Sequence, residues 1–371
     1  MTTKPTPLSV LDLAPVPAGG SAPQALRNAV DLARHAEAWG YRRYWVAEHH
    51  FVAVASVSPA VLIGQVLAAT SSIRVGSAAV QLGYTTTAAV AESFGTLAAL
   101  YPDRVDLGLG RSAQRKAQAR EATADDAQRA TPPPREVDGV LVPAPFDPSR
   151  LLARPRVLAG LDALIPGGAE TPSFSRQVGE LEDLISGRFA VSGTALRSRV
   201  AEAVDGPLWI FGSSAGESAA VAGARGLPFV ANYHVSPATT LDAVAAYREA
   251  FTPGALDQPH VVVSADVVVA GTDQEAATLA AGYPKWVHSI RFGDGAIEFP
   301  TDSNDLTDEQ RAAVADRTDT QFVGAASTVA ERLRALGHAT GADELVVTSV
   351  THDHAARLRS HELLAKEWGI L

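Results

Sequence analysis

The stretch Arg43-Tyr44-Trp45-Val46-Ala47-Glu48-His49-His50 decides the fold class of this chain. Its apolar part, Tyr44 to Ala47, is rich in aromatic and β-branched residues, which predicts a short buried strand. Directly after it, Glu48 to His50 bring three groups that can exchange protons to the carboxyl end of that strand. A strand that ends in such a polar cluster is typical of an α/β protein whose active site lies on that rim.

An amphipathic helix precedes this strand. Apolar residues recur at every third or fourth position from Leu26 to Trp39, and Gly40 ends the helix. The same alternation of strand and helix continues along the chain and gives eight candidate strands. They begin near Leu8, Tyr44, Ile73, Val105, Leu208, Phe229, Val261 and Leu345. Eight strands, each followed by a helix, predict a (β/α)8 TIM barrel, with a doubly wound parallel sheet as the alternative fold.

Residues 113–175 break this alternation after the fourth strand. They are rich in proline, with the run Thr131-Pro132-Pro133-Pro134 at their centre, which argues against a second hydrophobic core. We therefore expect one domain over residues 1–371, in which 113–175 form a long rim insertion that can serve as a lid. Within it, residues 137–142 are expected to form a short strand or hairpin arm. Residues 286–304, later in the chain, are expected to be irregular.

Composition excludes several classes of function. The net charge is −10, which disfavours nucleic acid or an anionic membrane as a partner, because both are bound through Lys and Arg. Neither a membrane-spanning apolar run nor a signal peptide is present in the sequence, so a cytoplasmic protein is expected. The absence of cysteine excludes disulfides, thiolate catalysis and Cys-ligated zinc. Met1 is the only methionine, which fits either compositional drift or selection against sulfur.

An anion site is predicted on the rim after the fourth and fifth strands. Arg111, followed by Ser112, can offer two parallel N–H groups to a phosphate. The turn from Gly212 to Ser218 opens a helix, whose free N–H groups and dipole favour an anion. Taken alone, this turn is better interpreted as a plain N-cap. Its pairing with Arg111 on a neighbouring strand end makes a phosphate site the preferred interpretation.

Histidines supply the remaining candidates. His49 and His50 are adjacent, so in a strand they point to opposite faces and one of them is expected to face the site. The cluster Asn232-Tyr233-His234 follows the sixth strand. The run His352-Asp353-His354 resembles a metal motif, but it follows the last strand, where Asp353 is well placed as an N-cap. No metal is therefore expected.

Several stretches together resemble the bacterial-luciferase-like flavin monooxygenases, in particular the single-chain subgroup of that family. The resemblance covers nearly the whole chain apart from roughly residues 114–171. It rests on the following stretches: Leu8 to Pro15, Tyr44 to Phe51, Val75 to Val80, Tyr101 to Arg111, Gly212 to Ser214, and His352 to Leu358.

The resemblance implies a TIM barrel, usually a homodimer, that binds a reduced flavin. It implies that His49 is the catalytic histidine, with Glu48 beside it. It also implies that Ala78-Ala79 form a non-proline cis peptide next to the flavin ring, close to Gly110. The phosphate contacts would come from Arg111, Ser112, Gly212, Ser213, Ser214, Ala215 and Ser218, and Tyr233 would flank the ring. Because Gly110 stands where light-emitting members carry a cysteine, light emission is not expected.

The resulting interpretation is an FMN-dependent monooxygenase of the two-component type. A separate NAD(P)H:flavin reductase would supply reduced FMN, which with O2 would oxidise a small aldehyde, ketone or sulfur compound. One alternative is an oxidoreductase that uses the deazaflavin F420 to move hydride on the same barrel. Another is a flavin-binding protein without turnover. Binding of FMN and of F420, measured separately, discriminates between these readings.

Overall fold

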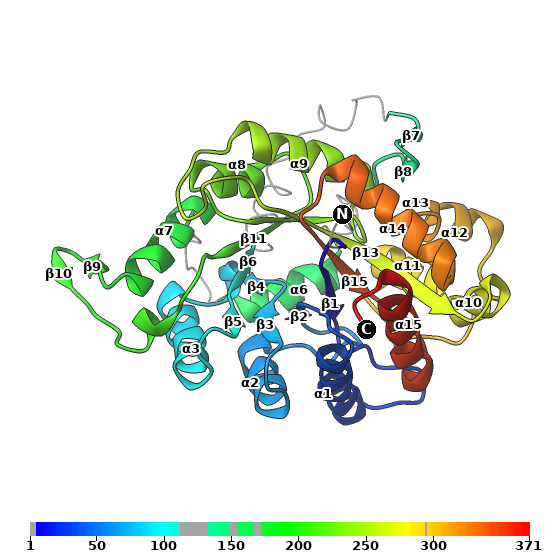
Figure 1. Cartoon of the computed structure of the whole chain (residues 1–371), viewed down its shortest axis with the longest axis horizontal. Coiled ribbons are helices and arrows are strands. Elements are labelled where there is room, and N and C mark those ends of the chain that lie inside the picture. Colours follow the sequence, from blue (N-terminus) through cyan, green and yellow to red (C-terminus); the bar gives the residue numbers. More distant parts are fainter. Residues whose placement is uncertain (1–4, 112–131, 148–153, 166–171, 294) are drawn as a thin grey trace.

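The computed structural model describes residues 5–111, 132–147, 154–165, 172–293 and 295–371 (Figure 1). Every strand predicted from the sequence is present, and all pairings in the main sheet are parallel. The main strands are β1 (Leu8–Asp12), β2 (Arg43–Val46), β3 (Arg74–Ser77), β4 (Val80–Gln81), β5 (Val105–Asp106), β6 (Gly108–Gly110), β11 (Trp209–Gly212), β12 (Phe229–Asn232), β13 (Val261–Ala270) and β15 (Glu344–Thr348).

The sheet closes on itself through its third and fourth strands. The stretch predicted as one strand over residues 73–82 is divided, because β3 pairs with β5 whereas β4 pairs with β6. Between them lies a cis peptide bond at Ala78-Ala79, and a 3-10 turn, η1 (Leu82–Tyr84), follows. Since β6 also pairs with β11, the strands form a ring around an axis. The fold is the predicted TIM barrel and not a doubly wound open sheet.

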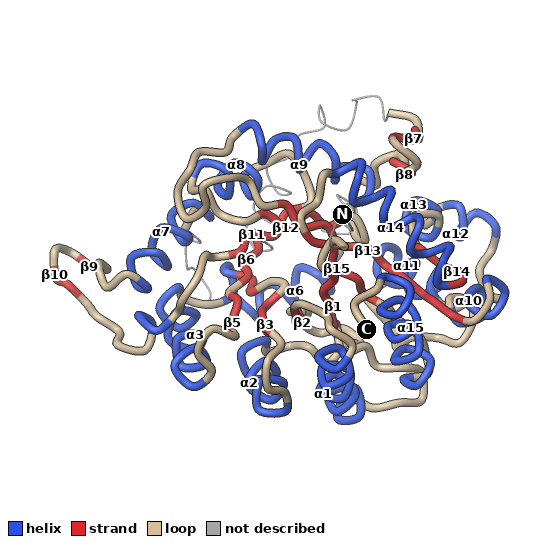
Figure 2. Tube along the Cα trace, in the orientation of Figure 1, coloured by secondary structure: helices blue, strands red, loops and turns tan. Residues whose placement is uncertain are grey.

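Helices surround the strands on the outside (Figure 2). Ser21 accepts a hydrogen bond from Gln24 N at the start of α1, and Pro59 opens α2. Among the described residues, no helix is both long and apolar enough to cross a membrane. The outer helices are α1 (Ala22–Ala38), α2 (Pro59–Ala69), α3 (Thr87–Leu100), α7 (Phe174–Ile185), α8 (Glu217–Ala224), α9 (Thr240–Glu249), α14 (Ala326–Thr340) and α15 (His354–Trp368).

Shorter elements fill the connections. The hairpin β7–β8 confirms the predicted strand or hairpin arm, and β8 lies beside α14 and η4. The second hairpin, β9–β10, projects away from the barrel (Figure 1). These elements are α6 (Pro155–Leu164), α10 (Asp273–Leu279), α11 (Tyr283–Phe292), α12 (Asp308–Ala312), α13 (Ala315–Thr318), η3 (Ala201–Ala203), η4 (Pro237–Thr239), β7 (Arg135–Val137), β8 (Val140–Val142), β9 (Ala190–Val191), β10 (Thr194–Ala195) and β14 (Phe322–Ala325).

Two expectations about connecting segments need comment. The irregular segment predicted over 286–304 is wrong in its first part, because α11 runs to Phe292. Pro284 in the first turn and the buried side chains of Tyr283, Trp286 and Val287, at helical spacing, account for this helix. Within the insertion at 113–175, residues 113–131, 148–153 and 166–171 lie outside the described residues, and the expected lid stays a prediction.

The strands separate two cores. β13 shows the division: Val262 packs inside the barrel with Trp45 and Trp209, whereas Val261 and Val263 pack outward against the helices. Alternate residues of a strand point to opposite faces, so Ser264, two residues after Val262, also points into the barrel. The interior is thus apolar around Val262, Trp45 and Trp209, and Ser264 brings a polar group toward the carboxyl ends of the strands.

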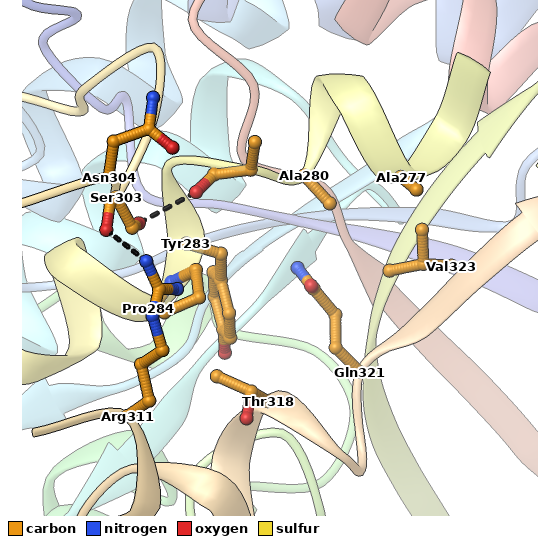
Figure 3. Close-up of a pocket in the computed structure, with 11 residues that line it drawn as sticks. Ala277, Ala280, Tyr283, Pro284, Ser303, Asn304, Arg311, Thr318, Gln321 and Val323 are labelled. Atoms are coloured by element: carbon orange, nitrogen blue, oxygen red, sulfur yellow. Dashed lines mark hydrogen bonds between the residues drawn. The ribbon is translucent and has the colours of Figure 1, made fainter. Parts of the chain in front are cut away.

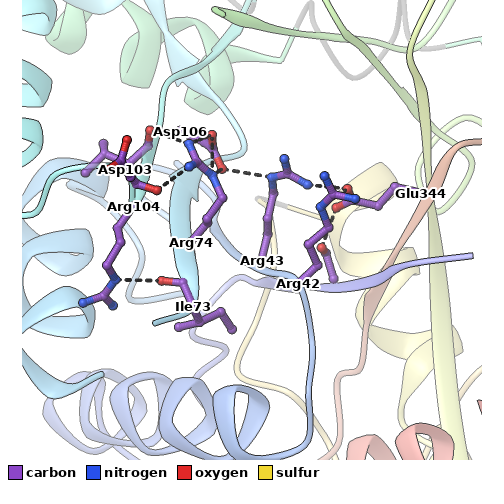
Figure 4. A network of polar contacts seen from close by, with 10 residues as sticks. Arg42, Arg43, Ile73, Arg74, Asp103, Arg104, Asp106 and Glu344 are labelled. Carbon is purple, nitrogen blue, oxygen red and sulfur yellow. Dashed lines mark hydrogen bonds and ion pairs between the residues drawn. The ribbon is translucent and has the colours of Figure 1, made fainter. Parts of the chain in front are cut away.

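An ionic network closes the amino-terminal end of the barrel (Figure 4). Arg43 donates to Asp106 over 2.9 Å and to Glu344, and Arg74 donates to the other oxygen of Asp106 over 2.6 Å. The guanidinium of Arg43 also lies 4.6 Å from the ring centre of Trp209. Arg43, Asp106 and Glu344 are almost completely buried, and each charge has an opposite partner, which burial requires. The cavity described below lies toward the other end of the barrel.

Candidate active site

A cavity of about 210 Å³ lies at the carboxyl ends of the barrel strands. One part of its wall is built from side chains no larger than a methyl group. Such a wall lets a flat ligand approach the backbone closely. The small residues of this wall are Ala47, Ala78, Ala79, Gly110 and Gly212. The polar residues that line the cavity are Glu48, His49, Gln81, Arg111, Ser218, Asn232, His234 and Ser264.

The predicted cis peptide is present between Ala78 and Ala79. It lies at the junction of β3 and β4, and both residues line the cavity. Gly110 lies opposite, where an added Cβ would approach the Cβ of Ala79 to 3.3 Å. A larger residue at position 110 would therefore narrow the cavity at this wall.

The structure separates the two adjacent histidines, although β2 ends at Val46 and strand alternation therefore does not account for the separation. His49 lines the cavity, while His50 turns away, with its Nε2 2.8 Å from Glu48 Oε1 and its ring edge-on to Tyr84. Burial within the barrel disfavours the charged ring of His49 and lowers its pKa to about 4, with a smaller contribution from the charge of His50. As a residue, His49 is nevertheless exposed, and it lines the cavity. His49 is therefore a neutral imidazole at physiological pH, able to donate or accept one proton.

Glu48 lines the same cavity, but its carboxylate is engaged. Oε1 pairs with His50, and Oε2 accepts the backbone N–H of Gln81 over 2.9 Å. The side chain of Gln81 in turn donates to the carbonyl of Glu48 over 2.6 Å. Burial raises the pKa of Glu48, although His50 and Gln81 act against that rise. These contacts join the end of β2 to β4, so Glu48 positions the loop that carries His49.

Two strand ends bring together residues that the sequence predicts for the anion site. Arg111 follows β6, and its Nε donates to Ser218 Oγ over 2.9 Å. Its Nη1 donates to the carboxylate of Glu217, the first residue of α8, also over 2.9 Å. Gly212 and Ser218 line the cavity, whereas Ser213, Ser214 and Ala215 form the connecting turn without lining it. Ser112 lies outside the described residues.

Tyr233 is not brought to this cavity. Its hydroxyl donates to the carbonyl of Leu141 in β8 over 2.8 Å, and its ring packs near Phe322. The next residue, His234, lines the cavity instead, with its Nδ1 2.6 Å from Ser264 Oγ. Burial, followed by the charges of Arg317 and His49, lowers the pKa of His234 to about 3.

Sequence reasoning placed His234 in the rim cluster but chose its neighbour. β12 ends at Asn232, so the strand alternation that would have separated positions 233 and 234 no longer applies beyond it. The usable signal was Ser264, an inward-facing polar residue on the adjacent strand β13, which needs a polar partner inside the barrel.

The triplet at the last strand is accounted for by capping. Asp353 is the N-cap of α15 and accepts from Ala355 N over 2.7 Å, as predicted. His352 contacts the carbonyl of Ala18, while His354 pairs with Asp31. The two histidines thus point to separate partners. Among the described residues, no group of three His, Asp or Glu side chains converges as metal ligands do.

A second cavity, of about 340 Å³, lies among α10, α11, α12, α13 and β14 (Figure 3). Its polar groups bond to one another: Arg311 donates to the carbonyl of Ser303, and Ser303 Oγ donates to the carbonyl of Ala281 over 2.6 Å. Gln321, on the same wall, donates to the buried Asp266 over 3.0 Å. This second cavity contains none of the residues predicted for chemistry. The cavity at the strand ends is therefore the candidate active site.

Comparison with known proteins identifies a family and several full-length relatives. The model of the family described as luciferase-like monooxygenase matches residues 6–132 and 177–344. YvbT of Bacillus subtilis is 36% identical over 98% of this chain and 97% of its own length. The luciferase-like monooxygenase of Escherichia coli K12 is 32% identical over 98% of this chain and 97% of its own. The crystal structure of apo-MsnO8 is 30% identical, with a TM-score of 0.75 over 99% of both chains.

More distant structures share the fold and differ in cofactor. The oxygenating constituent of 3,6-diketocamphane monooxygenase from Pseudomonas putida, in complex with FMN, has a TM-score of 0.59 at 22% identity, over 98% of this chain and 97% of its own. An F420-dependent secondary alcohol dehydrogenase with an F420–acetone adduct has a TM-score of 0.60 at 15% identity, over 98% and 99%. The family match and the two full-length relatives establish that this chain belongs to the luciferase-like monooxygenase family.

Proposed function

We propose that this protein is the oxygenase component of a two-component FMN-dependent monooxygenase. The observation that supports this most directly is one cavity that combines a cationic cradle, a wall of small residues and a neutral imidazole. Arg111, Ser218 and Gly212 suit the phosphate of FMN, and the wall of Ala78, Ala79 and Gly110 suits a flat ring.

When bound in its reduced form, FMN would supply two electrons to O2, so that one oxygen atom enters the substrate and the other leaves as water. The chain itself would bind the flavin, orient the substrate and exclude water. Leu11, Leu13 and Phe211 make part of the cavity apolar, which favours a dry site. His49 would donate or accept a proton of the reaction through its imidazole ring, which lines the cavity. Glu48 would hold the loop that carries His49 in place.

The mixed polar and apolar lining of the cavity suits a small aldehyde, ketone or sulfur compound beside the flavin. We further propose that a separate NAD(P)H:flavin reductase delivers reduced FMN by transient contact, and that the protein works as a homodimer. The FMN-binding neighbour, a type II Baeyer–Villiger monooxygenase, is the oxygenating constituent of its enzyme, and this supports the two-component arrangement.

The test is a binding and turnover comparison with the purified full chain. FMN, reduced FMN, riboflavin and F420 are titrated separately, and the flavin complexes are then mixed with O2 and a panel of aldehydes, ketones and thioethers. We expect FMN to bind more tightly than riboflavin, and 18O from labelled O2 to appear in one product. Tight binding of F420 without binding of FMN would overturn the proposal in favour of hydride transfer. Flavin binding without any product would favour storage.

A further inference from the structure

The guanidinium of Arg111 already has a hydrogen-bond partner on each of its two bidentate edges. A guanidinium receives an oxyanion in parallel fashion either through Nε and Nη2 or through Nη1 and Nη2. Nε is bonded to Ser218, and Nη1 is bonded to Glu217. Nη2, common to both edges, lies beside Gly216 and carries no hydrogen bond to the described residues.

The two partners respond differently to an incoming phosphate. The hydroxyl of Ser218 can rotate and donate its own proton to a phosphate oxygen, so it can remain in the cradle. The ionised carboxylate of Glu217 is an acceptor only and carries the same sign of charge as the phosphate. It therefore has to leave Arg111 or face a like charge at close range.

The exposure of the pair shows which partner can move. The side chain of Arg111 is 8% exposed, whereas that of Glu217 is 32% exposed. Glu217 can turn into solvent from the first turn of α8, but Arg111 is fixed by the barrel. Among the residues that the structure describes, Glu217 is the carboxylate within ion-pair distance of Arg111.

We propose that Glu217 competes with the ligand phosphate for Arg111 and thereby weakens the hold of the cradle on FMN. This inference rests on the proposed function, since it assigns Glu217 to the flavin-phosphate subsite. A cradle weakened in this way suits an oxygenase that receives its flavin from another protein and returns it after each turnover. Glu217 is thus a specificity-determining residue that reduces the advantage of a phosphorylated flavin over riboflavin.

The experiment compares Glu217→Gln with the wild type in the full chain. Glutamine keeps the shape and can still accept from Arg111, but it removes the charge. We expect FMN to bind about tenfold more tightly to Glu217→Gln, the usual order for one charge-assisted contact, and riboflavin to bind as before. The matched control is Glu182→Gln, which removes a similarly exposed carboxylate that pairs with Arg225 away from the cavity. It should leave the binding of both flavins unchanged.

Two results would overturn the inference. If Glu217→Gln binds FMN no better than the wild type, or binds it more weakly, then Glu217 holds Arg111 in place instead of competing with phosphate. If the wild type binds no FMN, the proposed cofactor is wrong, and inorganic phosphate titrated by calorimetry becomes the probe. Tighter phosphate binding by Glu217→Gln would then still support competition at Arg111, and equal binding would reject it.

Discussion

Asp12, at the end of the first barrel strand, forms a buried ion pair with Arg357 in the last helix. Arg357 Nη2 lies 2.5 Å from Asp12 Oδ1, and the two side chains are 3% and 1% exposed. Arg357 Nε also donates to the carbonyl of Ser349, and Asp12 accepts from Tyr44 and from Ala14 N. The pair therefore joins the two ends of the chain directly behind the strand ends that carry the cavity.

Removal of the cation from this pair should be costly. We expect Arg357→Gln to lower the free energy of unfolding by about 3–5 kcal/mol, because it leaves the charge of Asp12 buried and uncompensated. Urea unfolding followed by circular dichroism measures this change. The control is Arg359→Gln, two residues on, which breaks an exposed pair with Glu362 and should cost less than about 1 kcal/mol. Similar losses of unfolding free energy in both variants would show that the buried pair stabilises the fold no more than the exposed one.

The same pair predicts how stability depends on pH. Burial alone would raise the pKa of Asp12, but the charge of Arg357 and the hydrogen bonds from Tyr44 and Ala14 outweigh it, and the pKa is lowered from 3.8. A lowered folded-state pKa means that the stabilisation is present above the unfolded-state pKa and is lost as the pH falls below it. We expect the wild type to lose this contribution below about pH 4. In Arg357→Gln, the buried Asp12 has lost its cation, so stability should instead fall as the pH rises above about 4. The same dependence of unfolding free energy on pH in the wild type and the variant would refute this.

His49→Ala tests the proposed chemistry. We expect turnover to fall by about 10²–10⁴-fold, the range for a positioned acid–base group, while FMN affinity changes little. His50→Ala, which breaks the contact with Glu48 but not the cavity wall, should be milder. Single-turnover oxidation of the reduced-flavin complex, followed by absorbance and product yield, is the measurement. Normal yield from His49→Ala would make this histidine structural.

The pH profile of the wild type adds an independent check on His49. Since the pKa of His49 is lowered to about 4, its ring should gain a proton only near that pH. The acid limb of the turnover profile should therefore lie near pH 4 and be absent from His49→Ala. A limb near the ordinary histidine value of about 6.5 would show that His49 is less enclosed, or that another group controls the profile.

Arg111→Ala tests the cradle. Loss of the guanidinium should weaken FMN binding by about 1.5–3 kcal/mol, the scale of hydrogen bonds to charged groups. Riboflavin, which lacks the phosphate, should bind nearly as before. Fluorescence titration of both flavins gives the comparison, and Arg225→Ala serves as a control that removes a guanidinium away from the cavity. Equal losses for FMN and riboflavin would place the phosphate elsewhere.

The sequence predicts the barrel well because its signals are local and repeat. Apolar strand stretches such as Val261 to Ala270, and the glycine and proline residues at helix ends, are visible without knowledge of the fold. The position of Arg111 beside the Gly212 to Ser218 turn was also accessible, because carboxyl ends of parallel strands share one rim.

Side-chain direction beyond the last strand residue was not accessible in the same way. Tyr233 and His234 are both compatible with the rim, and the choice between them depends on Leu141, which accepts the tyrosine hydroxyl from a hairpin 92 positions away. Likewise, the pairing of Glu217 with Arg111 depends on the approach of two strand ends. No local pattern carries such contacts, so only the folded chain reveals them.

The network of Arg43, Asp106 and Glu344 bears on the order in which molecules come and go. Because these side chains seal the amino-terminal end of the barrel, the cavity is reached from the opposite rim. Two molecules that share such a blind-ended chamber cannot pass each other freely. The one that enters first lies deeper and departs last, so a deeply seated flavin would be exchanged only after the oxidised product has left.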